Sequence, residues 1–201
     1  MEKRYVITIS RQFGSLGRPI AMKLAELLGI EFYDREIVEK TAKNLGLPLS
    51  VIKETEESVK TRFFQMGYPL GSGATEQQDS IFNEQAKIIR DIVEKESCII
   101  VGRCSDFILG NEKNSIRIFI YAPYQDRYRN CVDILRMDQE SAKKMITRVD
   151  KARKAYHLHY AGYAPNDQDN QDIMINSSVL GINGTAQCLA EIAKIRFGLS
   201  Q

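Results

Sequence analysis

The sequence has almost no net charge, because its 28 lysines and arginines are nearly balanced by 26 aspartates and glutamates. A formal charge of +2 gives no long-range field of the kind that attracts nucleic acids or membrane surfaces. Long apolar runs are also missing, since none approaches the roughly 20 residues that span a bilayer, and the N-terminus lacks the apolar stretch of a signal peptide. We therefore expect a cytoplasmic protein with no nucleic-acid or membrane partner, whose anion binding depends on locally placed arginines and lysines.

Cysteine and histidine are too scarce for a disulfide framework or a zinc site. The four cysteines are Cys98, Cys104, Cys131 and Cys188. They form no CxxC pair and lie in apolar or helical patterns, which predicts buried, reduced thiols. The two histidines, His157 and His159, have no neighbouring cysteine or histidine to complete a metal set, so we expect them at the surface.

Short apolar runs alternate with helical patterns along most of the 201 residues. The runs predict strands over residues 5–10, 30–33, 98–101, 116–121 and 172–176. The helical patterns cover residues 20–28, 35–45, 80–94, 105–109, 123–135, 139–154 and 185–196. This alternation indicates a single α/β domain with a parallel sheet. A charged, turn-rich stretch at 48–79 interrupts it, and we expect a mobile insertion there.

The loop between the first strand and the first helix carries the clearest chemical signal. Its candidate phosphate-binding residues are Gln12, Phe13, Gly14, Ser15, Leu16, Gly17, Arg18 and Pro19. A loop that opens a helix beyond a parallel strand can direct backbone N–H groups and the positive helix end at a phosphate. A glycine-containing turn that binds no phosphate is the alternative for this loop alone.

Compared with the P-loop pattern G-x-x-x-x-G-K-[S/T], this loop is altered. If Gly17-Arg18 is aligned with G-K, Gln12 replaces the first glycine, Arg18 the lysine, and Pro19 the serine or threonine. Arg18 can still donate to phosphate oxygens as a planar fork. Pro19 has no hydroxyl for Mg²⁺, although proline is well tolerated in a first helical turn.

Several short pieces occur in a consistent order over nearly the whole chain. They are Ser10-Arg-Gln-Phe-Gly-Ser15, Phe32-Tyr-Asp34, Ile100-Val-Gly-Arg-Cys104, Asp150-Lys-Ala-Arg153 with Tyr156 and Tyr160, and Ile175-Asn-Ser-Ser178. Together they resemble the cytidylate kinases, and more closely the divergent bacterial cytidylate-kinase-like proteins. The resemblance implies a P-loop nucleotide-kinase fold: a three-layer α/β/α sandwich with a five-stranded parallel sheet in the order 2-3-1-4-5. It also implies one domain over 1–201, with an acceptor-binding insert at about 48–79 and a lid at about 148–170.

The same resemblance implies roles for individual residues. Asp34 and Arg103 match positions on the acceptor side, where Cys104 replaces an aspartate of the family and Asp106 is a possible substitute. Asp150 and Arg153 match an Asp–Arg pair of the lid. We therefore expect Asp34, Arg103, Asp106, Asp150 and Arg153 to bind the acceptor. Arg18, Arg148 and Arg153 are the expected catalytic residues, Arg11 is a possible addition, and Asp34 or Asp106 is the candidate ligand for Mg²⁺.

Structural alternatives exist for each of these residues. Asp34 can be a helix cap with no role in binding. Arg103 can be an ordinary ion-pair partner, and Asp150 with Arg153 can be an ordinary solvated ion pair. Cys104 is predicted to be a packed thiol. The tyrosines Tyr156, Tyr160 and Tyr163 can cover a base or pack the lid, and the sequence does not separate these possibilities.

The function expected from these residues is ATP-dependent phosphoryl transfer to a nucleoside monophosphate, most simply CMP or dCMP, with ATP and Mg²⁺ as cofactors. Phosphoryl transfer needs alignment, charge neutralisation and water exclusion, which arginines can provide. Two alternatives stay open: a nucleotide-binding or regulatory protein without turnover, favoured by the altered loop, and a kinase of another small metabolite. Small-molecule nucleotides are the expected partners.

Overall fold

The computed structural model describes residues 4–34 and 76–199, together with residues 37, 39, 40, 43, 44 and 46 between them. Within these residues, five strands form one parallel sheet in the order β2-β3-β1-β4-β5. The strands are β1 (Val6–Arg11), β2 (Glu31–Tyr33), β3 (Cys98–Val101), β4 (Ser115–Tyr121) and β5 (Ile173–Asn176). The predicted strand order and the parallel sheet are confirmed.

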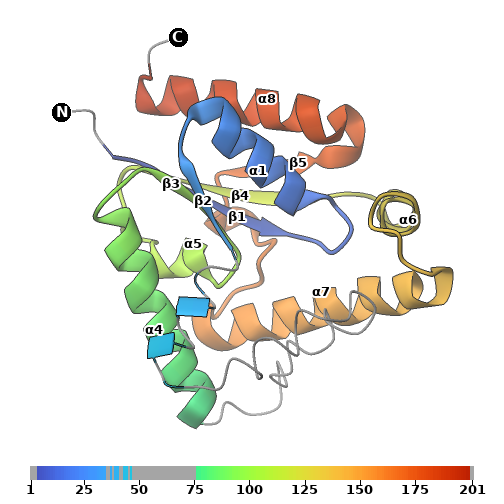
Figure 1. The fold of residues 1–201 in the computed structure, drawn as a ribbon, viewed down its shortest axis with the longest axis horizontal. Helices are drawn as coiled ribbons and strands as arrows, with labels where there is room; N and C mark the ends of the chain where they lie inside the picture. Colours follow the sequence, from blue (N-terminus) through green and yellow to red (C-terminus); the bar gives the residue numbers. More distant parts are fainter. Residues whose placement is uncertain are drawn as a thin grey trace.

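The described helices cover both faces of this sheet (Figure 1). They are α1 (Gly17–Leu28), α4 (Glu76–Val93), α5 (Ser105–Ile108), α6 (Tyr124–Arg129), α7 (Gln139–Ala161) and α8 (Ser177–Phe197). α1 and α8 pack on one face, where their alanines and leucines meet the isoleucines of β1 and β4. α4 and α5 pack on the other face, against Val6 and Ile100. All of β3 is buried, as its continuous apolar run predicts.

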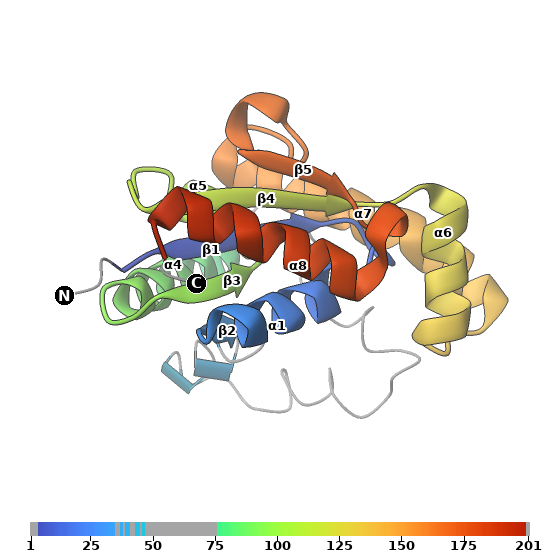
Figure 2. The same ribbon diagram turned by 90° about the horizontal axis from the view of Figure 1, so that it is seen from above.

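The carboxyl ends of β1 and β4 point toward α6, and α7 runs back beneath the sheet from there (Figures 1 and 2). Between α6 and α7, residues Asn130–Ile134 form a π-helical turn, a feature that often occurs at functional sites. The loop from β1 to α1 lies at this end of the sheet. The fold therefore gathers α1, α6 and α7 around the predicted phosphate loop.

The largest differences from the predicted helix boundaries are in α7 and α8. α7 continues to Ala161 instead of ending near residue 154, and Gly162, with a φ of 80°, ends it. α8 begins at Ser177 and not at residue 185, because Asn176 caps its first turn through Ser178 N–H, at 3.0 Å. A non-helical Gly181 then kinks the helix.

Most of the predicted insertion at 48–79 lies outside the described residues, and so does much of the predicted helix at 35–45. Residues 76–79 are the exception, since they form the start of α4. None of the described helices is both long enough and apolar enough to cross a membrane.

Candidate functional site

The loop between β1 and α1 is anchored to the end of β4. Gln12 N–H donates to the carbonyl of Ile120 at 3.0 Å, and the Gln12 side-chain oxygen accepts from Ala122 N–H at 3.1 Å. The Ser15 hydroxyl is also placed to donate to the Ile120 carbonyl, at 3.1 Å. Gln12 and Ser15 therefore hold the loop in one shape without any bound ligand.

Side chains from three other elements bind successive carbonyl groups of this loop. Arg127 of α6 donates to the Phe13 carbonyl at 3.2 Å, and Asn130 donates to the Gly14 carbonyl at 2.9 Å. The Ser177 hydroxyl, at the start of α8, donates to the Ser15 carbonyl at 2.7 Å. The carbonyl dipoles of the loop are thus satisfied by the protein itself.

The backbone N–H groups of the same loop are mostly unused. The N–H groups of Gly14, Leu16, Gly17 and Arg18 form no hydrogen bond with any described residue. The last two belong to the first turn of α1, where the helix dipole adds positive potential. A loop with satisfied carbonyls and free amides at a helix start is suited to an anion such as a phosphate.

The middle of α7 is docked on this loop. Asp150 accepts from Phe13 N–H at 2.7 Å and from the guanidinium of Arg127 at 2.5 Å. One turn later, Arg153 donates to the carbonyl of Arg11 at 3.0 Å. The Phe13 ring packs with Met145 and neighbouring side chains of α7 and the π-helical turn. α7 therefore covers one side of the loop.

Four arginines from separate elements surround the start of α1: Arg11, Arg18, Arg103 and Arg153. Burial lowers the pKa of Arg11, and the positive charges of Arg103 and Arg18 lower it further, while Asp34 opposes them. Burial also lowers the pKa of Arg153, with Arg11 adding repulsion. Cations held together in this way favour the binding of an anion between them.

Arg103 belongs to a turn with unusual backbone geometry. Gly102, Arg103 and Cys104 have φ angles of 76°, 61° and 52°, so three consecutive residues after β3 are left-handed. Two of them are not glycine, and such a conformation costs energy that the surrounding structure must offset. The turn holds Arg103 beside Arg11, beyond the carboxyl end of β3.

A family model described as the cytidylate kinase-like family matches residues 6–179 of the chain. The chain belongs to this family. Among solved structures, an uncharacterized protein from Eubacterium ventriosum is similar at 28% identity and a TM-score of 0.69, covering 96% of this chain and 98% of that one. A search of curated proteins found no match.

Two shikimate kinases share the fold of this cytidylate kinase-like protein at low sequence identity. The enzyme from Bacteroides thetaiotaomicron has 12% identity and a TM-score of 0.55, covering 94% of this chain and 98% of its own. The enzyme from Acinetobacter baumannii, in complex with shikimate, has 14% identity and a TM-score of 0.50, covering 98% and 95%. The P-loop kinase fold is thereby confirmed. Family membership and fold together support a kinase that acts on a nucleotide or another small metabolite.

Most of the predicted site residues of this cytidylate kinase-like protein come together, but two carboxylates have other roles. The side chain of Asp106 is buried, and both of its oxygens face Nε2 of His157, at 2.9 and 3.0 Å. Gln171 donates to the same carboxylate at 3.0 Å. Both oxygens of Asp106 are thus engaged inside the protein, so its role in binding the acceptor or a metal stays a prediction.

Asp150 also differs from its predicted role. Its carboxylate binds the Phe13 amide and Arg127, so in this structure it fixes α7 on the loop and is not free for an acceptor. It is not a solvated partner of Arg153 either. Arg148, predicted to be catalytic, is exposed and lies about 200° around α7 from Asp150, on a different face of the helix.

Asp34 lies near the loop, where it pairs with Arg18. The Nε atom of Arg18 donates to Asp34 Oδ2 at 3.0 Å, and the Arg18 guanidinium also lies over the Phe32 ring, 5.7 Å from its centroid. Asp34 is thus on the predicted acceptor side of the sheet. One of its two carboxylate oxygens is thus engaged by Arg18, and its role as a magnesium ligand stays a prediction.

The described residues contain no ready-made cluster of metal ligands. No cluster of three or more histidine, cysteine, aspartate or glutamate side chains is placed to hold an ion in the part of the chain that the structure describes. Both predicted ligands are engaged, Asp34 by Arg18 and Asp106 by His157. Pro19 lies in the first turn of α1 and offers no hydroxyl.

The tyrosines near the end of α7 pack helices together. Tyr160 stacks on Phe82 of α4 with ring centroids 3.9 Å apart, and Tyr156 meets Tyr160 edge-on at 4.8 Å. Tyr163 lies edge-on to His157 at 4.8 Å. His157 is buried, which corrects the predicted surface position, whereas His159 is exposed.

Sequence reasoning missed the residues that shape the loop from outside it, namely Arg127, Asn130 and Ser177. Nothing in their spacing links them to the loop, because they lie more than 100 residues from the carbonyls they bind. Cys104, by contrast, is a buried free thiol as predicted.

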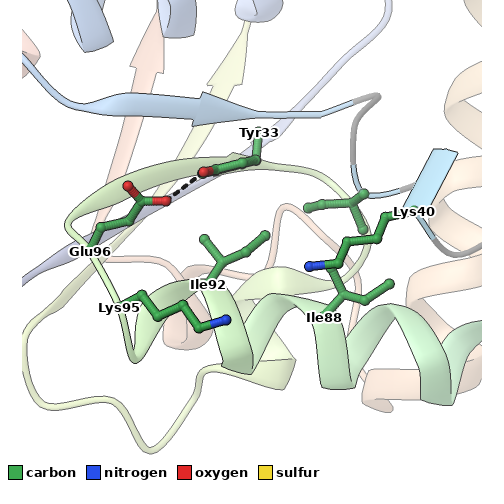
Figure 3. A pocket seen from close by; sticks show the side chains of 7 residues that line it. Tyr33, Lys40, Ile88, Ile92, Lys95 and Glu96 are labelled. Carbon is green, nitrogen blue, oxygen red and sulfur yellow. Dashed lines mark hydrogen bonds between the residues drawn. The ribbon is translucent and has the colours of Figure 1, made fainter. Parts of the chain in front are cut away.

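A separate cavity of about 200 Å³ lies on the α4 face of the sheet (Figure 3). Ile88 and Ile92 line it together with Lys40 and Lys95, and a 2.5 Å hydrogen bond joins Tyr33 to Glu96 at its edge. None of the loop residues or clustered arginines lines this cavity. It is therefore distinct from the phosphate loop.

Proposed function

We propose that this cytidylate kinase-like protein transfers the terminal phosphoryl group of ATP to a nucleoside monophosphate, with CMP or dCMP as the first candidates. The observation that carries the proposal is the gathering of Arg11, Arg103 and Arg153 around a loop with unused N–H groups. Phosphoryl transfer depends on positioning and on neutralising charge at the transferred group, and this arrangement can supply both. The choice of a nucleotide as the acceptor rests on the family to which the chain belongs.

In this proposal each element has a defined task. The N–H groups of Gly14, Leu16, Gly17 and Arg18 bind oxygens of the donor phosphates. Arg103 approaches from the end of β3 and faces the acceptor phosphate. Arg153, carried by the docked α7, neutralises charge on the transferred group. α7 also limits the access of water, which would otherwise compete with the acceptor.

Magnesium enters the proposal only as an ion carried by the phosphates of ATP. Mg²⁺ commonly keeps several waters and binds substrate phosphates with one or two carboxylates. The described carboxylates near the loop are engaged, as Asp34 is by Arg18, so no step of the proposed reaction depends on a protein-held metal.

The same pairing favours a second candidate, a nucleotide-binding protein that does not turn over. Arg18 and Asp34 neutralise one another in the absence of ligand. A protein that only senses a nucleotide needs the anion-binding loop but not a metal ligand. This candidate predicts binding of ATP without release of ADP.

A coupled assay of ADP release separates the two candidates. Mg-ATP is offered with CMP, dCMP, UMP, AMP or shikimate, and calorimetric titrations of ATP and CMP are run on the same sample. Turnover of about 1 s⁻¹ or more with CMP or dCMP, at the low end for kinases, supports the nucleotide kinase. If shikimate is phosphorylated and none of the nucleotides is, the proposed nucleotide acceptor is wrong. Binding of ATP without turnover would favour the nucleotide-binding protein that does not turn over.

A further inference from the structure

The start of α1 decides how the altered loop corresponds to a P-loop. Gly17 is the first residue of the helix, and Leu16 just before it is left-handed, with a φ of 59°. In the strand–GxxxxGK[ST]–helix motif the second glycine directly precedes the helix, and a left-handed residue is the place where glycine is favoured. The structure therefore aligns Leu16 with the second glycine and Gly17 with the lysine. The first glycine then corresponds to Arg11, one residue earlier than in the alignment on Gly17-Arg18.

The side chain of Arg11 occupies the space that a side chain on residue 17 would need. A Cβ atom added to Gly17 would lie 2.8 Å from Cβ of Arg11, closer than such atoms approach in proteins, and 3.0 Å from its Cγ. A Cβ atom on Gly102 would lie only 2.3 Å from Nη1 of Arg11. The Arg11 side chain thus starts beside the first turn of α1 and ends at the left-handed turn after β3.

We propose that Arg11 is the phosphate-binding cation of this loop. Arg11 stands where a P-loop has its first glycine, and Gly17 stands where a P-loop has its lysine, so the two residue types have exchanged places. The exchange leaves the charge in the same region, because the Arg11 stem crosses Gly17. It moves the charged group toward Gly102 and Arg103, between the donor loop and the acceptor side of the sheet. There a guanidinium can bind two phosphate oxygens at once.

The surroundings of Arg11 fit this role better than those of Arg18. Arg18 is half-exposed, with 50% of its side chain accessible, and it is held by Asp34. The Arg11 guanidinium, in contrast, forms no hydrogen bond with any described residue. The Asp34 carboxylate attracts it and Arg103 and Arg18 repel it, so an arriving phosphate would relieve the repulsion among the arginines as well as form hydrogen bonds. Arg11 therefore has both the position and the unused hydrogen-bonding capacity for an anionic ligand.

This inference takes its ligand from the proposed phosphoryl transfer, but it can be tested by binding alone. We would titrate the wild-type protein, Arg11→Gln, Arg18→Gln and the exposed control Arg90→Gln with ATP and with inorganic tripolyphosphate. Arg11→Gln should weaken binding of both ligands by about 10- to 100-fold, the usual effect of losing hydrogen bonds to a charged group. Arg18→Gln should have a smaller effect and Arg90→Gln none. Circular dichroism and thermal melting check that each variant is folded.

A reciprocal exchange gives a sharper test. Gly17→Lys alone should reduce binding and stability, because its Cβ would collide with Arg11. In the Arg11→Gly background the same substitution should become favourable, since the collision is gone and the usual glycine and lysine positions are restored. The double variant should recover tripolyphosphate binding to within about tenfold of wild type, the remainder being a geometric difference between lysine and arginine. A purely structural role of Arg11 predicts no such recovery.

Each result supports or overturns the inference. If wild-type protein binds ATP, equal binding by Arg11→Gln overturns it, and so does a larger loss in Arg18→Gln or a failed recovery in the folded double variant. If wild-type protein binds ATP but phosphorylates none of the acceptors, the proposed function fails while the binding series still decides the role of Arg11. If wild-type protein binds neither ATP nor tripolyphosphate, both are overturned.

Discussion

Nε2 of His157 lies 2.9 and 3.0 Å from the two carboxylate oxygens of Asp106, and both residues are buried. The other ring nitrogen, Nδ1, is 2.8 Å from the carbonyl of Tyr163. Both nitrogens therefore face acceptors, which is the arrangement expected for a protonated imidazole. The pair links α5 to the end of α7, next to the turn that carries Arg103.

This pair predicts a pH dependence of stability. Burial alone would lower the pKa of His157, but the Asp106 carboxylate outweighs it and the pKa is raised above 6.5. A raised pKa in the folded state stabilises the protein fully below about pH 6.5, and this stabilisation is lost as pH rises through the folded-state pKa. Urea unfolding between pH 6 and 9 should show a falling free energy of unfolding, at most about 1.4 kcal/mol per pH unit from this proton.

His157→Gln removes the titrating group, so the unfolding free energy of this variant should fall less steeply with pH than that of wild type. His159→Gln is the matched control, because His159 is exposed on the same helix and its substitution keeps the buried His157–Asp106 pair, so this variant should retain the component of the slope that His157→Gln loses. Parallel pH profiles for wild type and His157→Gln would show that the pKa of His157 is the same in the folded and unfolded protein, and a slope of opposite sign would show that the imidazole is neutral when buried.

The same pair illustrates where sequence reasoning stops. The strands and their surroundings were predictable, because apolar runs and glycine-ended helical patterns are local signals, and strand order followed from the family resemblance. Asp106 and His157 are 51 residues apart, and no local pattern links them. Their pairing depends on how α7 crosses the sheet. The sequence therefore predicts Asp106 as a ligand and His157 as a surface residue, although the two form a buried pair.

The phosphate loop shows a subtler difficulty. Its position between β1 and α1 and its glycines were evident from the sequence, and so was the surplus of arginines nearby. The choice between Arg11 and Arg18 was not, because it depends on the left-handed Leu16 and on where the helix begins. The sequence letters allow either alignment, and only the backbone conformation separates them.

Gly102→Ala should impair ligand binding more than it impairs stability. Its φ of 76° costs an alanine roughly 1–2 kcal/mol, and the added Cβ would displace the Arg11 guanidinium. Gly29→Ala is a matched control, since Gly29 has a φ of 63° but no atom within 4 Å of an added Cβ. Thermal melting should show similar destabilisation for both, whereas tripolyphosphate titration should show weaker binding only for Gly102→Ala. Unchanged binding in Gly102→Ala would show that the Arg11 guanidinium does not bind the ligand.

The four thiols should react at different rates in the native protein. Burial raises the pKa of Cys98 to about 12 and that of Cys131 to about 11, and it also raises the pKa of Cys104. Cys188 is only partly buried. Because the thiolate is the reactive species, a thiol-specific reagent at pH 8 should modify Cys188 first and the other three only on unfolding. Mass spectrometry of the digested protein identifies the site, and rapid modification of Cys104 would contradict the packing seen beside Arg103.

The docking of α7 on the loop should depend on Asp150. Asp150→Ala removes the acceptor for Phe13 N–H and leaves the buried Arg127 without its carboxylate. We expect a loss of about 2 kcal/mol in unfolding free energy, lower than for a fully buried pair because 26% of the Asp150 side chain is exposed. Glu140→Gln, which removes an exposed pair with Lys143 on the same helix, should change stability by less than about 0.5 kcal/mol.

Hydrogen exchange separates a local effect of Asp150→Ala from general destabilisation. The Phe13 amide should lose protection in Asp150→Ala, while amides in the middle of β3 should change only as far as global stability does. If α7 contributes to the site, ATP affinity should also fall, because Arg153 would no longer be held at the Arg11 carbonyl. A variant that retains Phe13 protection and ATP affinity would show that the contact of Asp150 with the loop does not hold α7 in place.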